Sequence, residues 1–229
     1  MPRLLLINPN TTEAVTRVMA ERALALAPPG GELNAVTARF GAAYIVDERS
    51  AAVAAHAVLD AADADAARPD AASAVLIGCF GDPGLLALRE PGQRPVTGLA
   101  EASMRAAAVH GRFAIVTGGA RWRPMLERLA WSLDLLAPLA GIVTVQANGA
   151  ELAADPPAAL RLLEAACQEA LRLPDVQCIV VGGAALAGMA AALQPRVPLP
   201  LIDSVDAGIH AAWALAGGAA VAQVLRTSP

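Results

Sequence analysis

The sequence predicts an α/β protein made of two pseudo-symmetric domains, each with a doubly wound parallel sheet, and an active site in the cleft between them. Short apolar runs that end at glycine alternate with segments of helical periodicity, as βα units do. Three blocks of the first half recur in the second half in the same order. In addition, Cys79 directly follows a buried apolar run in a glycine-rich turn, where parallel sheets bind ligands.

The first half begins with an apolar strand and a polar turn over 3–12, and Thr11 or Thr12 can cap the helix that starts near Glu13. The elements expected next are a strand at 33–37, a loop at 41–46, a helix at 47–67, a strand ending at 77, a strand at 96–97 and a helix at 100–109. Those expected in the second half are a strand at 112–117, a helix around 125–133, a strand at 142–146, a helix at 157–171, a strand at 178–181, a short segment at 198–202 and a helix from about 205. The aspartates at positions 60, 63, 65 and 70 are expected to form a solvated face.

The repeated blocks indicate an internal duplication. Residues 95–107 align without gaps on 200–212, residues 75–79 on 179–183, and residues 4–8 on 113–117. Composition alone explains one such match in an alanine-rich chain more easily than three in the same order. We therefore expect a first domain of residues 1–97 plus about 205–229 and a second domain of residues 98–204.

Composition excludes several classes of partner and cofactor. The net charge is −4 and there is no basic run, so we expect no nucleic acid and no anionic membrane as a partner. No apolar run is long enough to cross a bilayer. The three cysteines lack disulfide or metal-ligand spacing, which favours a reducing cytoplasm. The chain contains no lysine, which rules out a pyridoxal Schiff base, and the spacing of its histidines predicts no metal site.

Cys79 is the candidate catalytic residue. Gly78 and Gly81 flank it, and Asp82-Pro83 has the pattern of a cap and first turn of the next helix. A thiol that faces a helix amino terminus is expected to have a lowered pKa. The alternative is a buried structural cysteine, because free cysteine packs well.

Other candidate substrate-binding residues follow the predicted strands or lie in the loops beside them. The turn at 8–12 offers more donors than a helix cap needs, so it is predicted to bind an oxyanion; a plain cap is the alternative. Tyr44 can line the pocket or pack in the core, and Asp203 can cap the last helix or take part in catalysis. The predicted substrate-binding set is Asn8, Asn10, Thr11, Tyr44, Phe80, Gly81, Thr117, Gly118, Gly119, Gly182 and Gly183.

Four motifs carry a resemblance to a known family: INPNTT at 7–12, GCFGDPG at 78–84, GGAALAG at 182–188 and PLID at 200–203. Over essentially its whole length the chain resembles the hydantoin and allantoin racemase branch of the aspartate/glutamate racemase superfamily. The resemblance implies two facing domains, a homo-oligomer and chemistry without a cofactor. It also implies two cysteines that flank a carbon acid, one removing a proton and the other returning it.

The second of these cysteines is missing, because the internal alignment places Gly183 opposite Cys79. Cys178 lies about 16 Å upstream on the same predicted strand, and Cys167 lies on an apolar helix face, so neither replaces it. We therefore expect a single cysteine to move a proton at a carbon next to a carbonyl. The expected substrate is a small anionic or hydantoin-like molecule, or an amino acid or other carboxylate. The alternatives are a one-cysteine decarboxylase or other lyase or hydrolase of the same fold, and a non-catalytic small-molecule binder.

Overall fold

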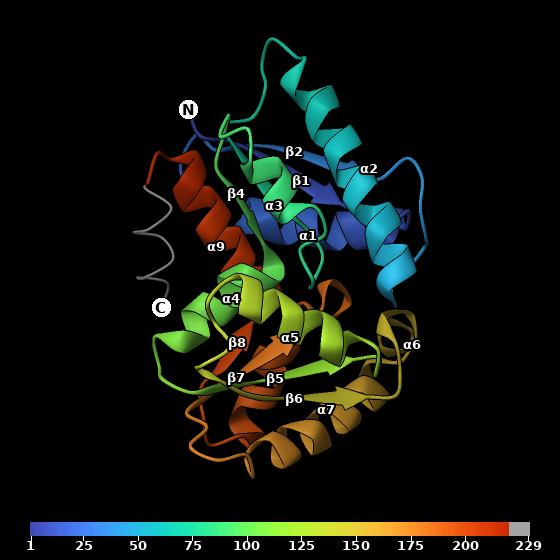
Figure 1. Cartoon of the computed structure of the whole chain (residues 1–229), viewed down its shortest axis with the longest axis vertical. Coiled ribbons are helices and arrows are strands. Elements are labelled where there is room, and N and C mark those ends of the chain that lie inside the picture. The colour runs from blue at the N-terminus through green and yellow to red at the C-terminus, as the bar shows by residue number, and fades with distance from the viewer. Residues whose placement is uncertain (220–229) are drawn as a thin grey trace.

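The computed structural model describes residues 1–219, which form two four-stranded parallel sheets (Figure 1). The first sheet has the order β2-β1-β3-β4 and the second the order β6-β5-β7-β8. Their strands are β1 (Arg3–Asn8), β2 (Glu32–Thr37), β3 (Ala74–Ile77), β4 (Val96–Gly98), β5 (Phe113–Gly118), β6 (Leu139–Val145), β7 (Cys178–Gly182) and β8 (Leu201–Asp203). The identical order in both sheets confirms the predicted fold class of two pseudo-symmetric parallel α/β units.

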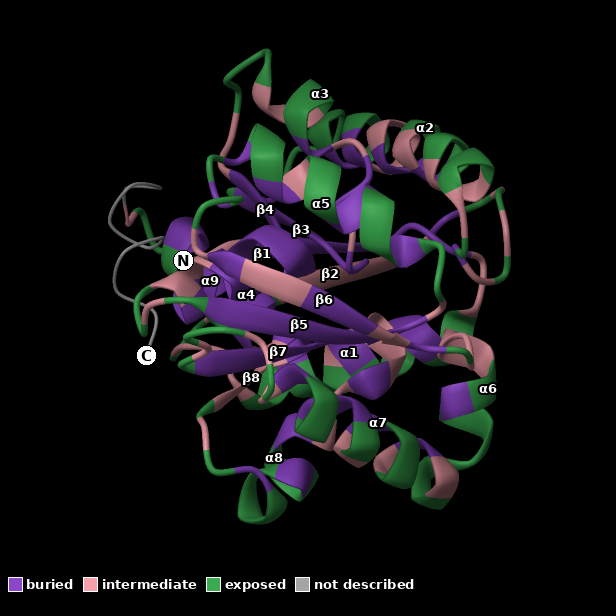
Figure 2. Ribbon diagram, turned by 60° about the horizontal axis from the view of Figure 1, so that its bottom comes forward, coloured by how far each residue is buried: buried purple, intermediate pink, exposed green. Residues whose placement is uncertain are grey.

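Apart from Arg3 at the start of β1, the central strands of both sheets are buried because helices cover both of their faces (Figure 2). In the first sheet Ile7 pairs with Ile77, and in the second Val116 pairs with Val181. Buried parallel strands are continuous apolar runs rather than alternating ones, which is why the sequence located them. The carboxyl ends of β3 and β7 lead directly into the turns that carry Cys79 and Gly183.

Nine α-helices and two short 3₁₀ turns are present within residues 1–219. The helices are α1 (Glu13–Ala25), α2 (Glu48–Ala66), α3 (Leu85–Arg89), α4 (Leu99–Ala108), α5 (Trp122–Ser132), α6 (Gly149–Ala154), α7 (Pro156–Ala170), α8 (Met189–Leu193) and α9 (Ser204–Ala216), and the 3₁₀ turns are η1 (Ala184–Leu186) and η2 (Gln194–Arg196). The sequence analysis did not predict α6 or α8. None of the helices is both long and apolar enough to span a membrane.

Helices α4 and α9 are exchanged between the two sheets. Helix α4 follows β4 of the first sheet but packs mainly against β7 of the second, whereas α9 follows β8 and packs mainly against β3. The two helices also pack against each other. Arg22 of α1 forms two 2.6 Å hydrogen bonds with Asp206, which fastens α9 to the first half. The domain boundaries stay a prediction, and residues 220–229 of the first predicted domain lie outside the described residues.

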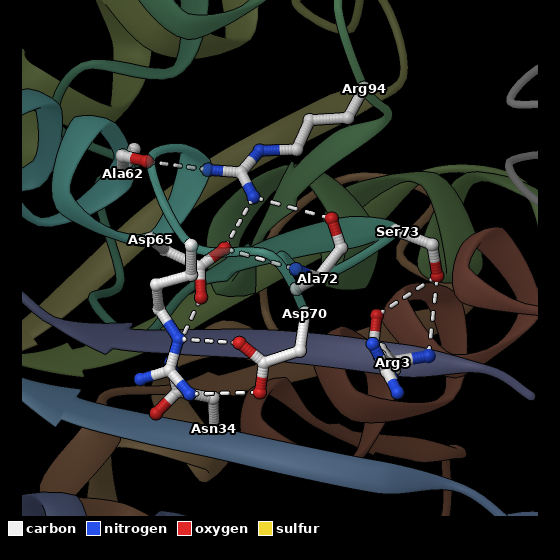
Figure 3. Close-up of polar contacts among 9 residues, drawn as sticks. Arg3, Asn34, Ala62, Asp65, Asp70, Ala72, Ser73 and Arg94 are labelled. Carbon is white, nitrogen blue, oxygen red and sulfur yellow. Dashed lines mark hydrogen bonds and ion pairs between the residues drawn. The ribbon is translucent and has the colours of Figure 1, made fainter.

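A buried ion pair holds the end of α2 on the first sheet, away from the cleft (Figure 3). Asp65 accepts hydrogen bonds from Arg94 (2.5 Å), the backbone of Ala72 (3.1 Å) and Asn34 (2.9 Å). Burial opposes ionisation, but these donors outweigh it and lower the pKa of Asp65. The prediction of a solvated acidic face is therefore wrong at Asp65, which is only 4% exposed.

Candidate active site

A pocket of about 590 Å³, its open mouth included, lies where the carboxyl ends of the two sheets meet. The first half contributes Asn10, Val15, Tyr44, Ile45, Gly78, Cys79 and Phe80. The second half contributes Thr117, Gly118, Trp122, Gly149, Leu152, Gly182, Gly183, Ala184, Ala185 and Leu186. Of the predicted substrate-binding residues, Asn8, Thr11, Gly81 and Gly119 do not line this pocket.

Cys79 lies in a tight turn immediately after β3. Its N–H donates to the carbonyl of Ile77 (2.9 Å), and its own carbonyl accepts from Gly81 (3.0 Å) and Asp82 (3.2 Å). Gly78 allows the close approach of α1, since a Cβ there would lie 2.7 Å from the Cε atom of Met19. These contacts leave Cys79 only 7% exposed, with its exposed surface on the pocket.

The thiol does not have the lowered pKa that the sequence analysis predicted. Burial is the main cause that raises the pKa of Cys79, and the charge of Asp82 raises it further. The expected helix dipole is weak here, because α3 has only five residues and does not begin until Leu85. At neutral pH, Cys79 is therefore a protonated thiol, which can donate a proton.

Asp82 caps a different helix from the one predicted. Helix α3 has Gly84 at its N-cap and no side-chain cap. The Asp82 carboxylate instead accepts from the backbone N–H groups of Ala100 (3.0 Å) and Glu101 (2.7 Å), in the first turn of α4. The capping motif was recognised correctly, but its partner lies 18 residues further along the chain and is reached only through the tertiary fold.

The polar turn after β1 is bonded mostly to itself. Asn8 is fully buried, and its Nδ2 atom donates to Asn10 Oδ1 (3.0 Å), the carbonyl of Thr12 (3.1 Å) and Thr16 Oγ1 (2.9 Å). Asn10 is the one residue of the predicted trio Asn8, Asn10 and Thr11 that reaches the pocket. Asn8 is thus placed to shape the turn that presents Asn10.

The loop before α2 is attached to this turn and brings Tyr44 to the pocket. Thr12 is the N-cap residue of α1, but its side chain makes no capping bond to the helix. Its hydroxyl donates instead to the carbonyl of Ala43 (2.7 Å), and the N–H of Thr11 donates to Ala42 (3.1 Å). The predicted capping bond is absent because the Thr12 hydroxyl is turned toward this loop and does not accept from an N–H of the first turn of α1. Tyr44 both lines the pocket and packs against the core.

Glycines let the two halves approach closely around the thiol. A Cβ on Gly182 would lie 2.2 Å from the ring of Phe80, so that ring lies against β7 of the other half. A Cβ on Gly81 would lie 2.4 Å from the ring of Trp122. On β5, the Thr117 hydroxyl donates to the carbonyl of Gly182 (2.7 Å), so its hydrogen already has an acceptor within the protein.

Gly183 is the residue that the internal alignment places opposite Cys79, and its backbone conformation is one that suits glycine. Its φ of +149° lies in a region that side-chain-bearing residues rarely adopt. Its N–H donates to the hydroxyl of Ser204 (3.1 Å), so this predicted substrate-binding amide already has a partner within the protein. Asp203 is a structural cap of α9, accepting from Val205 (2.9 Å) and Asp206 (3.3 Å).

No second thiol lines the pocket among the described residues. Cys178 lies buried at the start of β7 and Cys167 lies buried on α7. The described residues that line the pocket also include no charged side chain. Sequence reasoning missed the apolar lining, including Trp122, Leu152 and Leu186. For Leu152 a signal was available: Asn148 and Glu151 form a capping box that begins α6, with bonds of 2.9, 3.2 and 2.8 Å.

A lone thiol between the ends of two parallel sheets, surrounded by backbone amides and apolar side chains, defines a small-molecule site. A sequence model described as Asp/Glu/Hydantoin racemase matches residues 4–212. The chain therefore belongs to the Asp/Glu/hydantoin racemase family and is a racemase-family enzyme, an isomerase.

Named relatives span nearly the whole chain. The hydantoin racemase of Paenarthrobacter aurescens is 33% identical, in an alignment that covers 93% of this chain and 90% of the relative. The solved allantoin racemase from Klebsiella pneumoniae is 32% identical with a TM-score of 0.86, covering 100% of this chain and 94% of that one. Arylmalonate decarboxylase, at 22% identity and a TM-score of 0.63 over 96% of this chain and 94% of that one, shares the fold.

Proposed function

We propose that this enzyme exchanges the proton on a ring carbon next to a carbonyl in a hydantoin-like substrate, and that Cys79 is the only thiol that takes part in the reaction. The observation that carries the proposal is the combination of a cysteine in the pocket with a lining that has no charged side chain among the described residues. The hydantoin and allantoin racemase names of the relatives support the same substrate class.

The uncharged lining favours a neutral ring over a free carboxylate. Burying a carboxylate without a cation costs several kcal/mol, because the lost hydration is not replaced. A hydantoin ring instead presents amide donors and acceptors, which the side chain of Asn10 and the hydroxyl of Tyr44 can pair. Its ring substituent would contact apolar side chains such as Trp122 and Leu186.

In the proposed reaction, the thiolate of Cys79 removes the proton from the ring carbon, and the electron pair of the C–H bond moves into the enolate. The thiol so formed returns a proton to the same carbon. The raised pKa makes the thiolate scarce at neutral pH but a strong base once formed. We assign the enolate oxygen first to the backbone amide of Phe80, because the Gly183 amide is bonded to Ser204 and Gly118 is part of the β5 ladder.

A lyase is the alternative that one thiol favours. In such an enzyme a carboxylate leaves as carbon dioxide, and the protonated Cys79 delivers a proton to the resulting enediolate. Its substrate would be a dianion or monoanion, however, and the described pocket lining offers it no cation. The uncharged lining therefore places this reading second.

Deuterium wash-in tests the proposal. Both enantiomers of 5-substituted hydantoins, the corresponding free amino acids and an arylmalonate are incubated in D₂O with the wild type and with Cys79→Ser. We expect wash-in to the hydantoins alone, and none with the variant. Wash-in to amino acids but not hydantoins would contradict the substrate class, carbon dioxide release alone would indicate the lyase, and calorimetric binding without any turnover would indicate a non-catalytic binder.

A further inference from the structure

Asp82 is held in an unusual conformation directly behind the cysteine turn. Its φ of +47° is uncommon for a residue other than glycine, and its side chain is 3% exposed. Both carboxylate oxygens accept backbone N–H groups of α4, and its own N–H donates to the carbonyl of Cys79. Strain at a buried residue persists only when surrounding contacts fix it, and here they fix the cysteine turn.

The start of α4 is shaped to receive this carboxylate. Gly98 is the N-cap residue of α4, and a Cβ there would lie 2.2 Å from the Asp82 carboxyl carbon. Helix α4 packs against β7, the strand of the second sheet that ends at Gly182. The bonds of Asp82 to α4 therefore connect the cysteine turn of the first half, through α4, to β7 of the second half. The position of the thiol relative to the opposite wall of the pocket thus depends on Asp82.

The charged groups around Asp82 come from four helices. Arg89 of α3 forms an ion pair with Glu101 of α4, which also bonds to Arg105 (3.1 Å). These pairs leave Asp82 without a salt bridge of its own, and Cys79 is the nearest titratable group on its own loop. Two further charged residues line the groove beside it, Glu48 of α2 and Arg128 of α5, and they pair with each other (2.6 Å).

We propose that Asp82 is a positioning residue for proton transfer: it ties the Cys79 turn to α4 and places a carboxylate directly behind the thiol. This inference rests on the proposed role of Cys79. Burial raises the pKa of Asp82 to about 7, so its charge appears within the range in which enzymes work. When Asp82 ionises, the thiol becomes harder to ionise, and when Asp82 is protonated this opposition disappears.

The pH dependence of Cys79 alkylation tests the coupling without any substrate. While the pH is below the pKa of an isolated thiol, its alkylation rate rises about tenfold for each unit of increase in pH, because only the thiolate reacts. We expect iodoacetamide labelling of Cys79, followed by peptide mass spectrometry, to rise less steeply around pH 7 in the wild type. Asp82→Asn should remove this inflection and raise the rate at pH 8 by about tenfold, a change of one pH unit in the thiol pKa.

Asp203→Asn is the matched control, because Asp203 caps α9 as Asp82 caps α4 but belongs to the half that brings no thiol to the pocket. It should retain the wild-type inflection. Asp82→Glu, which keeps the charge, should also retain it and serves if Asp82→Asn fails to fold. A wild-type profile with a single slope through pH 7, or an inflection that survives in Asp82→Asn, would overturn the proposal. An inflection in an enzyme that turns over no hydantoin would support the role of Asp82 while contradicting the proposed function.

Discussion

Replacing Asp82 by asparagine should change how the stability of the protein depends on pH. The Asp82 carboxyl has an ordinary pKa of 3.8, and burial, with a smaller contribution from Glu101, raises it to about 7 in the folded state. Between these values the folded protein retains a proton that the unfolded chain has released. The free energy of unfolding therefore falls as the pH rises through this range.

The expected magnitude follows from the width of that range. Each pH unit contributes about 1.4 kcal/mol, so ionisation of Asp82 costs the folded state about 4 kcal/mol between pH 4 and pH 7. Above pH 7 the carboxyl is ionised in both states and its contribution is constant. Asparagine does not titrate, so Asp82→Asn should lack this loss.

Urea unfolding from pH 4 to pH 8, with the wild type and the variant measured together, gives the difference directly. Relative to the wild type, the free energy of unfolding of Asp82→Asn should rise by about 4 kcal/mol across the range. Asp65→Asn provides a control whose difference from the wild type should stay flat over this range, because the pKa of Asp65 is lowered and its stabilisation is lost only below about pH 4. If the difference in the free energy of unfolding between the wild type and Asp82→Asn stays constant from pH 4 to pH 7, the raised pKa of the buried Asp82 carboxyl is refuted.

Three further predictions concern the pocket and its support. Cys79→Ser should abolish deuterium wash-in, while the Tm measured by circular dichroism should fall only slightly. In the wild type, iodoacetamide should label Cys79 before the other two cysteines. Earlier labelling of either of those two would contradict the assignment of the site. Asp65→Ala should cost about 3 kcal/mol in urea unfolding, because it leaves the buried guanidinium of Arg94 unpaired. Gly183→Cys should raise the ratio of the racemisation rate, measured by chiral chromatography, to the wash-in rate, and its φ should lower the stability by about 1–3 kcal/mol. The control Ala185→Cys, also in the pocket, should not raise that ratio. Equal rates of racemisation and wash-in in the wild type would reveal a second acid.

The strands and most long helices could be predicted because their signals are local. Buried runs such as Val75–Ile77 end at glycine, and the observed β3 (Ala74–Ile77) differs from the expected strand by little. The expected helix at 47–67 corresponds to α2 (Glu48–Ala66), whose cap uses the adjacent Asp47 and Ser50. Helix α6 has an equally local signal in its capping box, so it too could have been predicted from the sequence.

The site was predictable as a set of turns but not as a set of contacts. Cys79, Phe80, Gly118 and Gly183 reach one pocket because the strands before them are parallel, which the sequence indicates. Asn8 had the same local pattern as its neighbours, yet its donors are consumed by Asn10, Thr12 and Thr16 within the turn. Which donor faces inwards depends on the tertiary packing of α1, and no spacing rule reports it.

The two halves cap their exchanged helices in different ways, and the two sides of the pocket differ accordingly. In the second half the cap is Asp203, at the N-cap of α9 itself, and it also accepts from the N–H of Gly188 (2.7 Å). In the first half the corresponding N-cap is Gly98, and the carboxylate comes instead from the cysteine loop. A duplicated fold thus retains both caps, but only Asp82 places its charge beside a thiol. Adding a cysteine at Gly183 would place a second sulfur near a cap that is built differently from that of Cys79, so the two faces of the substrate should exchange protons at different rates.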